Sequence, residues 1–147
     1  MASEVHVDGI SNFDKALEDL KIKVEGASKS FVMLGGQVIA DKAKAEFVGG
    51  TMPPPWQGPN FPHPTMHSGF LRNSIRVDAV VKTGAGWMST TGPHSVYGRR
   101  IELGYTGTGS FPYYTTRPFP YLKPGLEKSK SSLEELFQRL VTTAQEA

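Results

Sequence analysis

Apolar residues recur at alternating steps of four and three between residues 11 and 47. Because this spacing places side chains on one face of a helix, the segment is predicted to form a single long helix that ends at Gly49-Gly50. The pair Gly35-Gly36 predicts a kink, since each glycine costs about 1 kcal/mol relative to Ala in a helix. The stripe is longer than a small sheet can cover, so part of it is expected to pack against a C-terminal helix or a second copy of the chain. The stripe consists of Phe13, Leu17, Leu20, Val24, Ala27, Phe31, Leu34 and Val38.

A proline-rich segment follows this helix, and residues 51–69 hold six of the eleven prolines. Proline has no backbone N–H, so we expect a loop or arm over 49–69 that neither continues the helix nor sits inside a sheet. Its apolar side chains Trp56, Phe61 and Met66 are interpreted as docking onto a surface such as another subunit. The alternative is that they cap the chain's own core.

Strand patterns occupy the next part of the chain. Apolar side chains alternate with other residues from Ile75 through Val77 and Ala79 to Val81, which predicts a strand with one buried face. A turn over 83–86 and a second strand over 87–91, ended by Gly92-Pro93, complete a predicted hairpin. Leu71 and Ile75 are expected to begin the buried face, and Gly69 to allow the turn that leads the chain into the sheet.

Two further elements are predicted before the last helix. Residues 95–103 resemble a short helix with Val96, Tyr97 and Ile101 on one side and Gly104 as its end. The glycine-rich turn over 106–110 is expected to join two more short strands, the second over 111–116.

The pattern becomes helical again from Pro124 or Gly125 onwards. The predicted fold class is therefore α+β, with a small mostly antiparallel β-sheet packed by a long N-terminal helix and a C-terminal helix. Its length fits a single domain over residues 1–147. The apolar stripe of the last helix consists of Leu126, Leu133, Leu136, Phe137, Leu140 and Val141.

Composition narrows the classes of protein. There is no cysteine, so neither disulfides nor thiolate metal sites are available, and a reducing cytosol would suit the chain. No run of eighteen apolar residues occurs, and the first ten residues carry Glu4, His6 and Asp8 where a signal peptide needs an apolar stretch. We expect a soluble protein that is not exported by a cleaved signal.

Charge is unevenly distributed, although the net charge is only +2. Residues 1–50 carry a net −2, residues 51–124 a net +5 and residues 125–147 a net −1. The basic middle is suited to a phosphate backbone or to an acidic neighbouring subunit, and the simpler alternative is that these charges only keep the surface solvated.

No residue pattern indicates catalysis. His63 and His67 have the spacing of helical metal ligands, but prolines 62 and 64 forbid that helix and no acid lies nearby. Glu102 is the only acid between Lys82 and Glu127, so no paired carboxylate is available for acid-base chemistry, and an ion pair locally or with a neighbouring subunit is the simpler interpretation. No phosphate-binding loop and no nucleophile elbow occurs. We expect no enzyme activity, no metal and no cofactor.

Three short motifs occur in a characteristic order. They are Ser68-Gly69-Phe70-Leu71-Arg72-Asn73-Ser74-Ile75, then Val96-Tyr97-Gly98-Arg99-Arg100-Ile101-Glu102-Leu103-Gly104, then Arg117-Pro118-Phe119-Pro120-Tyr121-Leu122-Lys123-Pro124-Gly125-Leu126. Their order resembles the head-tail joining or tail-completion family of long-tailed bacteriophages, which is related to lambda's tail-completion protein. The chain departs from the family pattern at Gly98 and Gly125, where the pattern has alanine.

The resemblance implies a structural virion protein of the head-to-tail connector or upper tail. Such a protein would assemble as a sixfold ring, contact other connector and tail proteins, and surround double-stranded DNA without reading its sequence. Candidate residues facing the DNA channel are Arg72, Arg76, Arg99 and Arg100. Candidate residues at subunit interfaces are Trp56, Phe61, Met66, Tyr97, Glu102, Phe119 and Tyr121.

Two other functions stay open at this point. A tail terminator shares the same general order of helix, sheet and helix. A free DNA-binding module would use the basic middle segment, with Trp87, Tyr113 and Tyr114 as a platform on which bases stack. A hydrolase is disfavoured, because neither a nucleophile nor paired carboxylates can be found.

Overall fold

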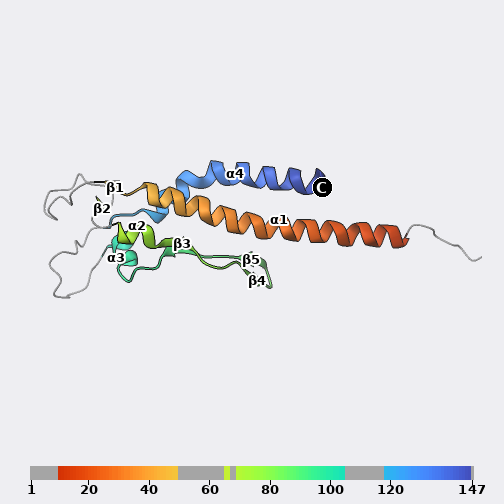
Figure 1. The fold of residues 1–147 in the computed structure, drawn as a ribbon, viewed down its shortest axis with the longest axis horizontal. Coiled ribbons are helices and arrows are strands. Elements are labelled where there is room, and N and C mark those ends of the chain that lie inside the picture. The colour runs from red at the N-terminus through yellow and green to blue at the C-terminus, as the bar shows by residue number, and fades with distance from the viewer. Residues whose placement is uncertain (1–9, 50–64, 67–68, 105–117, 147) are drawn as a thin grey trace, which may run out of the picture.

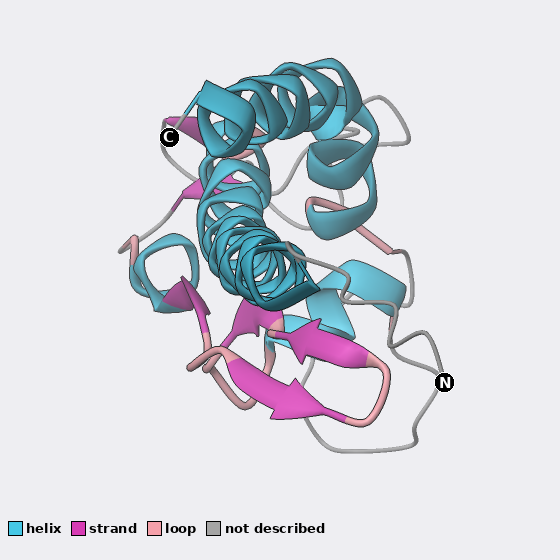
Figure 2. Ribbon diagram, turned by 90° about the vertical axis from the view of Figure 1, so that its right-hand side faces the viewer, coloured by secondary structure: helices cyan, strands magenta, loops and turns pink. Residues whose placement is uncertain are grey.

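A computed structural model describes residues 10–49, 65–66, 69–104 and 118–146 of the chain. The fold is α+β, as predicted, and has three layers: helix α4 (Leu122–Glu146), helix α1 (Ile10–Ala45) and a hairpin of short strands. Helix α1 lies in the middle, with α4 along one side and the strands along the other (Figures 1 and 2).

Helix α1 confirms the predicted long N-terminal helix, and its central glycines lie where the neighbouring layers come closest. The helix continues through Gly35-Gly36 without interruption. A Cβ atom on Gly36 would lie 2.8 Å from Cγ1 of Val77 in the hairpin, and one on Gly35 would lie 3.1 Å from Cδ2 of Leu133 in α4. The glycine pair therefore lets both outer layers approach the helix closely. The sequence had suggested a kink at this point instead.

The hairpin differs from the predicted one by a bulge. Strand β3 (Ile75–Val77) pairs with β6 (Thr91–Pro93), and β4 (Val81–Thr83) pairs with β5 (Gly86–Met88), both antiparallel. Val77 faces Thr91 and Val81 faces Met88, so four steps along one strand match three along the other. One extra residue in the first strand reverses which side chains face the core. The predicted burial of Ala79 and Val81 is therefore wrong, and both are exposed.

The second correction in the hairpin concerns Gly92-Pro93, which was predicted to end a strand but belongs to β6. The backbone N–H of His94 donates to the carbonyl of Ser74 across 3.0 Å, and that of Asp78 donates to Thr90 across 2.8 Å. In an antiparallel ladder with these bonds, Pro93 occupies a position that needs no N–H donor.

Four short elements surround this frame: β1 (Val48–Gly49), β2 (Thr65–Met66), α2 (Phe70–Ser74) and α3 (Gly98–Leu103). Strands β1 and β2 pair in parallel, so the end of the proline-rich segment does enter a small sheet. Residues 70–74 form a helical turn rather than the start of a strand, and Gly69 precedes it in the left-handed region with φ of 74°.

Helix α3 begins three residues later than predicted and ends at Gly104, as expected. Val96 was placed on the packed side of this helix, but it lies before the helix and its side chain is 96% exposed. The strands predicted around the turn at 106–110 lie outside the described residues.

Among the described residues, the core lies at the end of the molecule where α1 finishes. Partly buried side chains from the hairpin, α3 and α4 pack around it. Two glycines let the elements meet there: a Cβ on Gly125 would lie 2.7 Å from the backbone of Ala43, and one on Gly98 would lie 2.5 Å from Cγ of Pro93. Among the described residues, the buried hydrophobic side chains are Ala40, Ala43, Leu71, Ile75 and Tyr121.

Candidate interaction surface

The N-terminal half of α1 presents an apolar stripe to solvent. Phe13, Leu17, Leu20 and Val24 are spaced by four, three and four residues, and their exposed fractions lie between 48% and 63%. A contiguous exposed row of large apolar side chains is unusual on a soluble monomer and typically marks a binding surface. We call these four residues the α1 stripe.

The outer part of the stripe is uncovered because α4 stops short of it, whereas Leu20 and Val24 lie level with the last turn of α4 and line a groove with it. Helix α4 runs antiparallel to α1: Gly125 packs on Ala43, and the ring of Phe137 packs edge-on against Phe31 with centroids 5.6 Å apart. Helix α4 then ends at Glu146, and α1 extends well past it (Figure 1).

An open groove continues from the stripe along α1, between α4 and the hairpin. It has a volume of about 610 Å³, and its walls are mainly apolar. One wall comes from α4, the other from β4 and β5, and the floor from α1. Its apolar lining includes Leu20, Val24, Phe31, Trp87, Phe137 and Val141.

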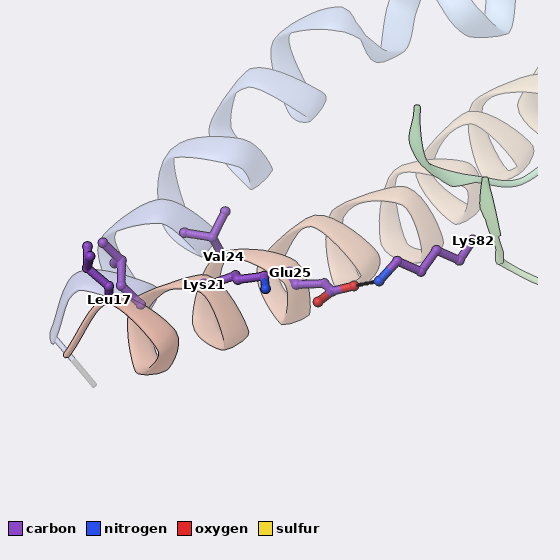
Figure 3. Close-up of a pocket in the computed structure, with 6 residues that line it drawn as sticks. Leu17, Lys21, Val24, Glu25 and Lys82 are labelled. Carbon is purple, nitrogen blue, oxygen red and sulfur yellow. Dashed lines mark hydrogen bonds and ion pairs between the residues drawn. The ribbon is translucent and has the colours of Figure 1, made fainter. Parts of the chain in front are cut away.

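A charged pair marks the edge of this surface. The ammonium group of Lys82 in β4 donates to the carboxylate of Glu25 in α1, beside Leu17, Lys21 and Val24 (Figure 3). The hydrogen bond from Lys82 and its positive charge lower the pKa of Glu25 below the ordinary value. This contact holds the tip of the hairpin against α1, although its exposure to solvent makes it weak.

Trp87 lies in the groove under two lysines. The ammonium groups of Lys29 and Lys82 lie 5.2 Å and 5.6 Å from the centre of its ring, which is the geometry of a cation–π contact. The ring is thus engaged within the chain and half-buried.

The four candidate channel arginines fall into different environments. Arg72 is half-buried, and its Nε donates to the carbonyl of Lys44 across 3.1 Å near the end of α1. Arg76 is exposed and its Nη2 lies 3.0 Å from Nδ1 of His94, whose Nε2 lies 2.9 Å from a carboxylate oxygen of Asp78. Arg99 and Arg100 are exposed on α3.

Five of the seven candidate interface residues fall into three groups. Tyr97 and Phe119 are both half-buried. Tyr97 packs against the core, and its ring lies 6.1 Å from that of Phe70. Trp56 and Phe61 lie outside the described residues. The backbone of Met66 forms β2, and the structure does not describe its side chain.

Tyr121 is completely buried in the chain's own core, not on its surface. Its ring packs 5.0 Å from that of Phe47, and its hydroxyl donates to the carbonyl of Gly98 across 3.1 Å. Burial and the nearby negative charge of Glu102 raise the pKa of Tyr121 far above its ordinary value. The prediction of Tyr121 as an interface residue therefore needs correction, because its side chain has no surface to offer a partner.

Glu102 has a structural role that the sequence did not suggest. Its carboxylate accepts hydrogen bonds from the backbone N–H groups of Tyr121, Leu122 and Lys123 at 2.7, 2.9 and 3.0 Å. These are the donors left without partners in the first turn of a helix, so Glu102 caps α4 from a distance. The cap explains why α4 begins at Leu122 rather than at Pro124 or Gly125, which were the predicted starts. The residue that caps this helix is far from it in sequence, so only folding could show it.

Other kinds of site have no support within the parts of the chain that the structure describes. No group of three or more His, Cys, Asp or Glu side chains there is arranged to hold a metal ion. No described helix is long and apolar enough to cross a membrane. Comparison with protein-family models, with curated proteins and with solved structures finds no match for this chain.

Proposed function

We propose that this protein is a structural subunit of the head-to-tail connector or upper tail of a long-tailed bacteriophage, where it works by assembling into a ring with copies of itself. The observation that carries the assembly is the exposed α1 stripe together with the small core. The order of the three motifs, which resembles the tail-completion family, carries the placement in a phage particle.

The balance of buried and exposed apolar side chains supports assembly. Among the described residues, five hydrophobic side chains are buried, whereas fourteen large ones are more than 40% exposed. Single exposed apolar residues are ordinary, but here four of the fourteen form one row on α1, and a fifth, Phe137, lines the groove beside it. Contacts with neighbouring subunits would remove this surface from water and add to the stability that the small core provides.

The positions of the four arginines support a channel for DNA only in part. Arg76, Arg99 and Arg100 are exposed, as contact with phosphate requires. Arg72 uses one of its donors to hold the end of α1, so its main contribution is structural. The proposed role in a DNA channel therefore centres on Arg76, Arg99 and Arg100.

The test of assembly is the mass and shape of the purified chain, measured by light scattering after gel filtration and by negative-stain electron microscopy. We expect rings whose mass is a multiple of the 16.0 kDa subunit. A chain that stays monomeric at every concentration, or that is absent from purified phage particles, would contradict the proposal. Salt-dependent DNA binding by such a monomer would favour the free DNA-binding module instead.

The channel role has a separate test. The triple variant R76Q/R99Q/R100Q should still form rings but should retain DNA poorly in assembled particles, since non-specific binding depends on the number of neutralised phosphates. A control that removes three charges elsewhere, K15Q/K42Q/K130Q, should leave retention unchanged. Equal retention in the two variants would remove the channel role and leave the ring intact.

A further inference from the structure

We infer that the projecting end of α1 docks into the groove between α4 and the hairpin of a second copy, with Phe13 and Leu17 as its anchors. This inference rests on the proposed function and deepens it, because it names the two surfaces that meet between neighbouring subunits of the ring. It uses none of the three exposed arginines assigned to the channel.

The α1 stripe has two parts with different surroundings. Leu20 and Val24 line the groove together with the last turn of α4, whereas Phe13 and Leu17 lie closer to the N-terminus of α1. Residues 10–19 therefore project past α4 by about 15 Å (Figure 1). We call residues 10–19 the α1 tip. The chain thus carries an apolar projection and, beside it, an apolar groove.

The α1 tip can reach only the groove of another molecule. Helix α1 is uninterrupted from Ile10 to Ala45, and it forms the floor of its own groove, so the tip cannot fold back into that groove. The groove of a second copy is open to solvent along one side. The tip can lie across that opening with only its two anchor side chains inside, so that α4 and the hairpin of the receiving copy keep their positions.

The side chains on the two surfaces complement each other. Phe13 and Leu17 are four residues apart, so they project from the same face of the helix. Their exposed fractions are 63% and 48%, and in the groove Leu20, Val24 and Phe137 are also about half exposed. Docking removes apolar surface from water on both sides at once, and an aromatic anchor in a groove is typical of a strong contact.

Charge identifies the tip of a second copy as the occupant. The α1 tip carries three acids and one lysine, a net −2, and two of the acids, Asp14 and Glu18, each follow an anchor directly. The groove holds Lys29 and Lys82 beside the ring of Trp87. Within the described part of the chain, no carboxylate pairs with Lys29. Docking therefore brings an acidic helix end to a basic groove.

The contact is compatible with a closed ring. The projection and the groove are different surfaces, so each copy inserts its tip into one neighbour and receives the tip of the other. Such a heterologous contact closes into a ring when the rotation between subunits allows it.

The first test reverses charges and measures, by sedimentation velocity, the concentration at which half of the chain is assembled. D14K/E18K makes the tip basic and K29E makes the groove acidic, so each variant alone should raise this concentration by roughly tenfold. An equal mixture should assemble like the wild type, because every tip then has a groove of opposite charge. K15E is the control, since Lys15 lies on the face of α1 opposite the anchors, and it should change nothing.

The second test separates the two surfaces. F13E/L17E has no functional tip, and A144E places a charged side chain at the end of the groove that Ala144 lines. Each variant alone should stay monomeric, with the circular dichroism spectrum of the wild type. Their mixture should form one-to-one dimers and nothing larger, because a single contact remains possible. A mixture that stays monomeric contradicts the inference.

The third test reports on the groove directly. W56F leaves Trp87 as the only tryptophan. Its emission should move to shorter wavelength as assembly buries the ring, and F13E/L17E in the same background should abolish that shift.

The outcomes distinguish this contact from the proposed function. Rings that form equally well in D14K/E18K and K29E, with unchanged Trp87 emission, uphold the proposed function and reject the contact. Charge-sensitive open chains with shifted Trp87 emission uphold the contact and reject the ring. A wild-type chain that never assembles overturns both.

Discussion

The carboxylate of Glu102 accepts a hydrogen bond from the backbone N–H of Tyr121 across 2.7 Å, linking residues nineteen positions apart. The same carboxylate serves the next two N–H groups, while the Tyr121 hydroxyl returns a hydrogen bond to Gly98 at the start of α3. These hydrogen bonds hold the start of α4 against both Glu102 and Gly98 of α3. The core of the protein depends on that connection, because Tyr121 is one of its largest buried side chains.

The cap makes Glu102 a stability determinant. E102A leaves three N–H groups at the start of α4 without their charged acceptor, and we expect the free energy of unfolding to fall by about 1–3 kcal/mol. E102Q should lie between E102A and the wild type, since its amide keeps one acceptor oxygen. The measurement is urea unfolding, with E134A on the exposed face of α4 as the control, expected within about 0.5 kcal/mol of the wild type. Equal losses in E102A and E134A would contradict the cap.

Two glycines in α1 should respond to alanine in opposite directions. A Cβ on Gly26 meets nothing within 4 Å, so G26A should stabilise the protein by up to about 1 kcal/mol through helix propensity. A Cβ on Gly36 would lie 2.8 Å from Val77, so G36A should destabilise it by about 1–3 kcal/mol despite the same gain in propensity. Thermal and urea unfolding of both variants decide the matter, and a G36A protein as stable as G26A would show that the hairpin is not packed this closely.

The buried Tyr121 should make the folded protein less stable at alkaline pH. Its pKa is raised in the folded protein, mainly by burial, so the unfolded chain releases the phenol proton first, near its ordinary pKa of about 10. The contribution of Tyr121 is constant below that pH, and as the pH rises further it decreases by up to about 1.4 kcal/mol per pH unit. Urea unfolding between pH 8 and 11 measures the slope.

The matched variant for this prediction is Y121F. It loses the hydrogen bond to Gly98, so it should be less stable at pH 8, but its stability should fall less steeply above pH 10 than that of the wild type. Identical slopes for the two proteins would mean that another group causes the alkaline loss.

The sequence predicted the two long helices, the turn at 83–86 and the α+β class, because these follow from local rules. Helical periodicity and glycine-rich turns depend on residues a few positions apart, which can be compared along the printed chain. The hairpin was predicted with the wrong register, since nothing in the period-two pattern announces one extra residue between Val77 and Val81. Gly36 was interpreted as a weak point in the helix, because its close neighbour Val77 is distant in sequence.

The candidate surface was likewise predictable from the sequence only in part. The apolar row from Phe13 to Val38 was evident from the sequence, and so was the fact that a small sheet could not cover all of it. Only the tertiary structure decided which half is exposed, because that depends on the level at which Gly125 of α4 meets Ala43 and on where α4 then ends. Likewise the acid Glu102 was visible in the sequence, but its role as a helix cap was fixed by folding. Contacts between distant segments set these features, and the spacing of residues along one segment carries no information about them.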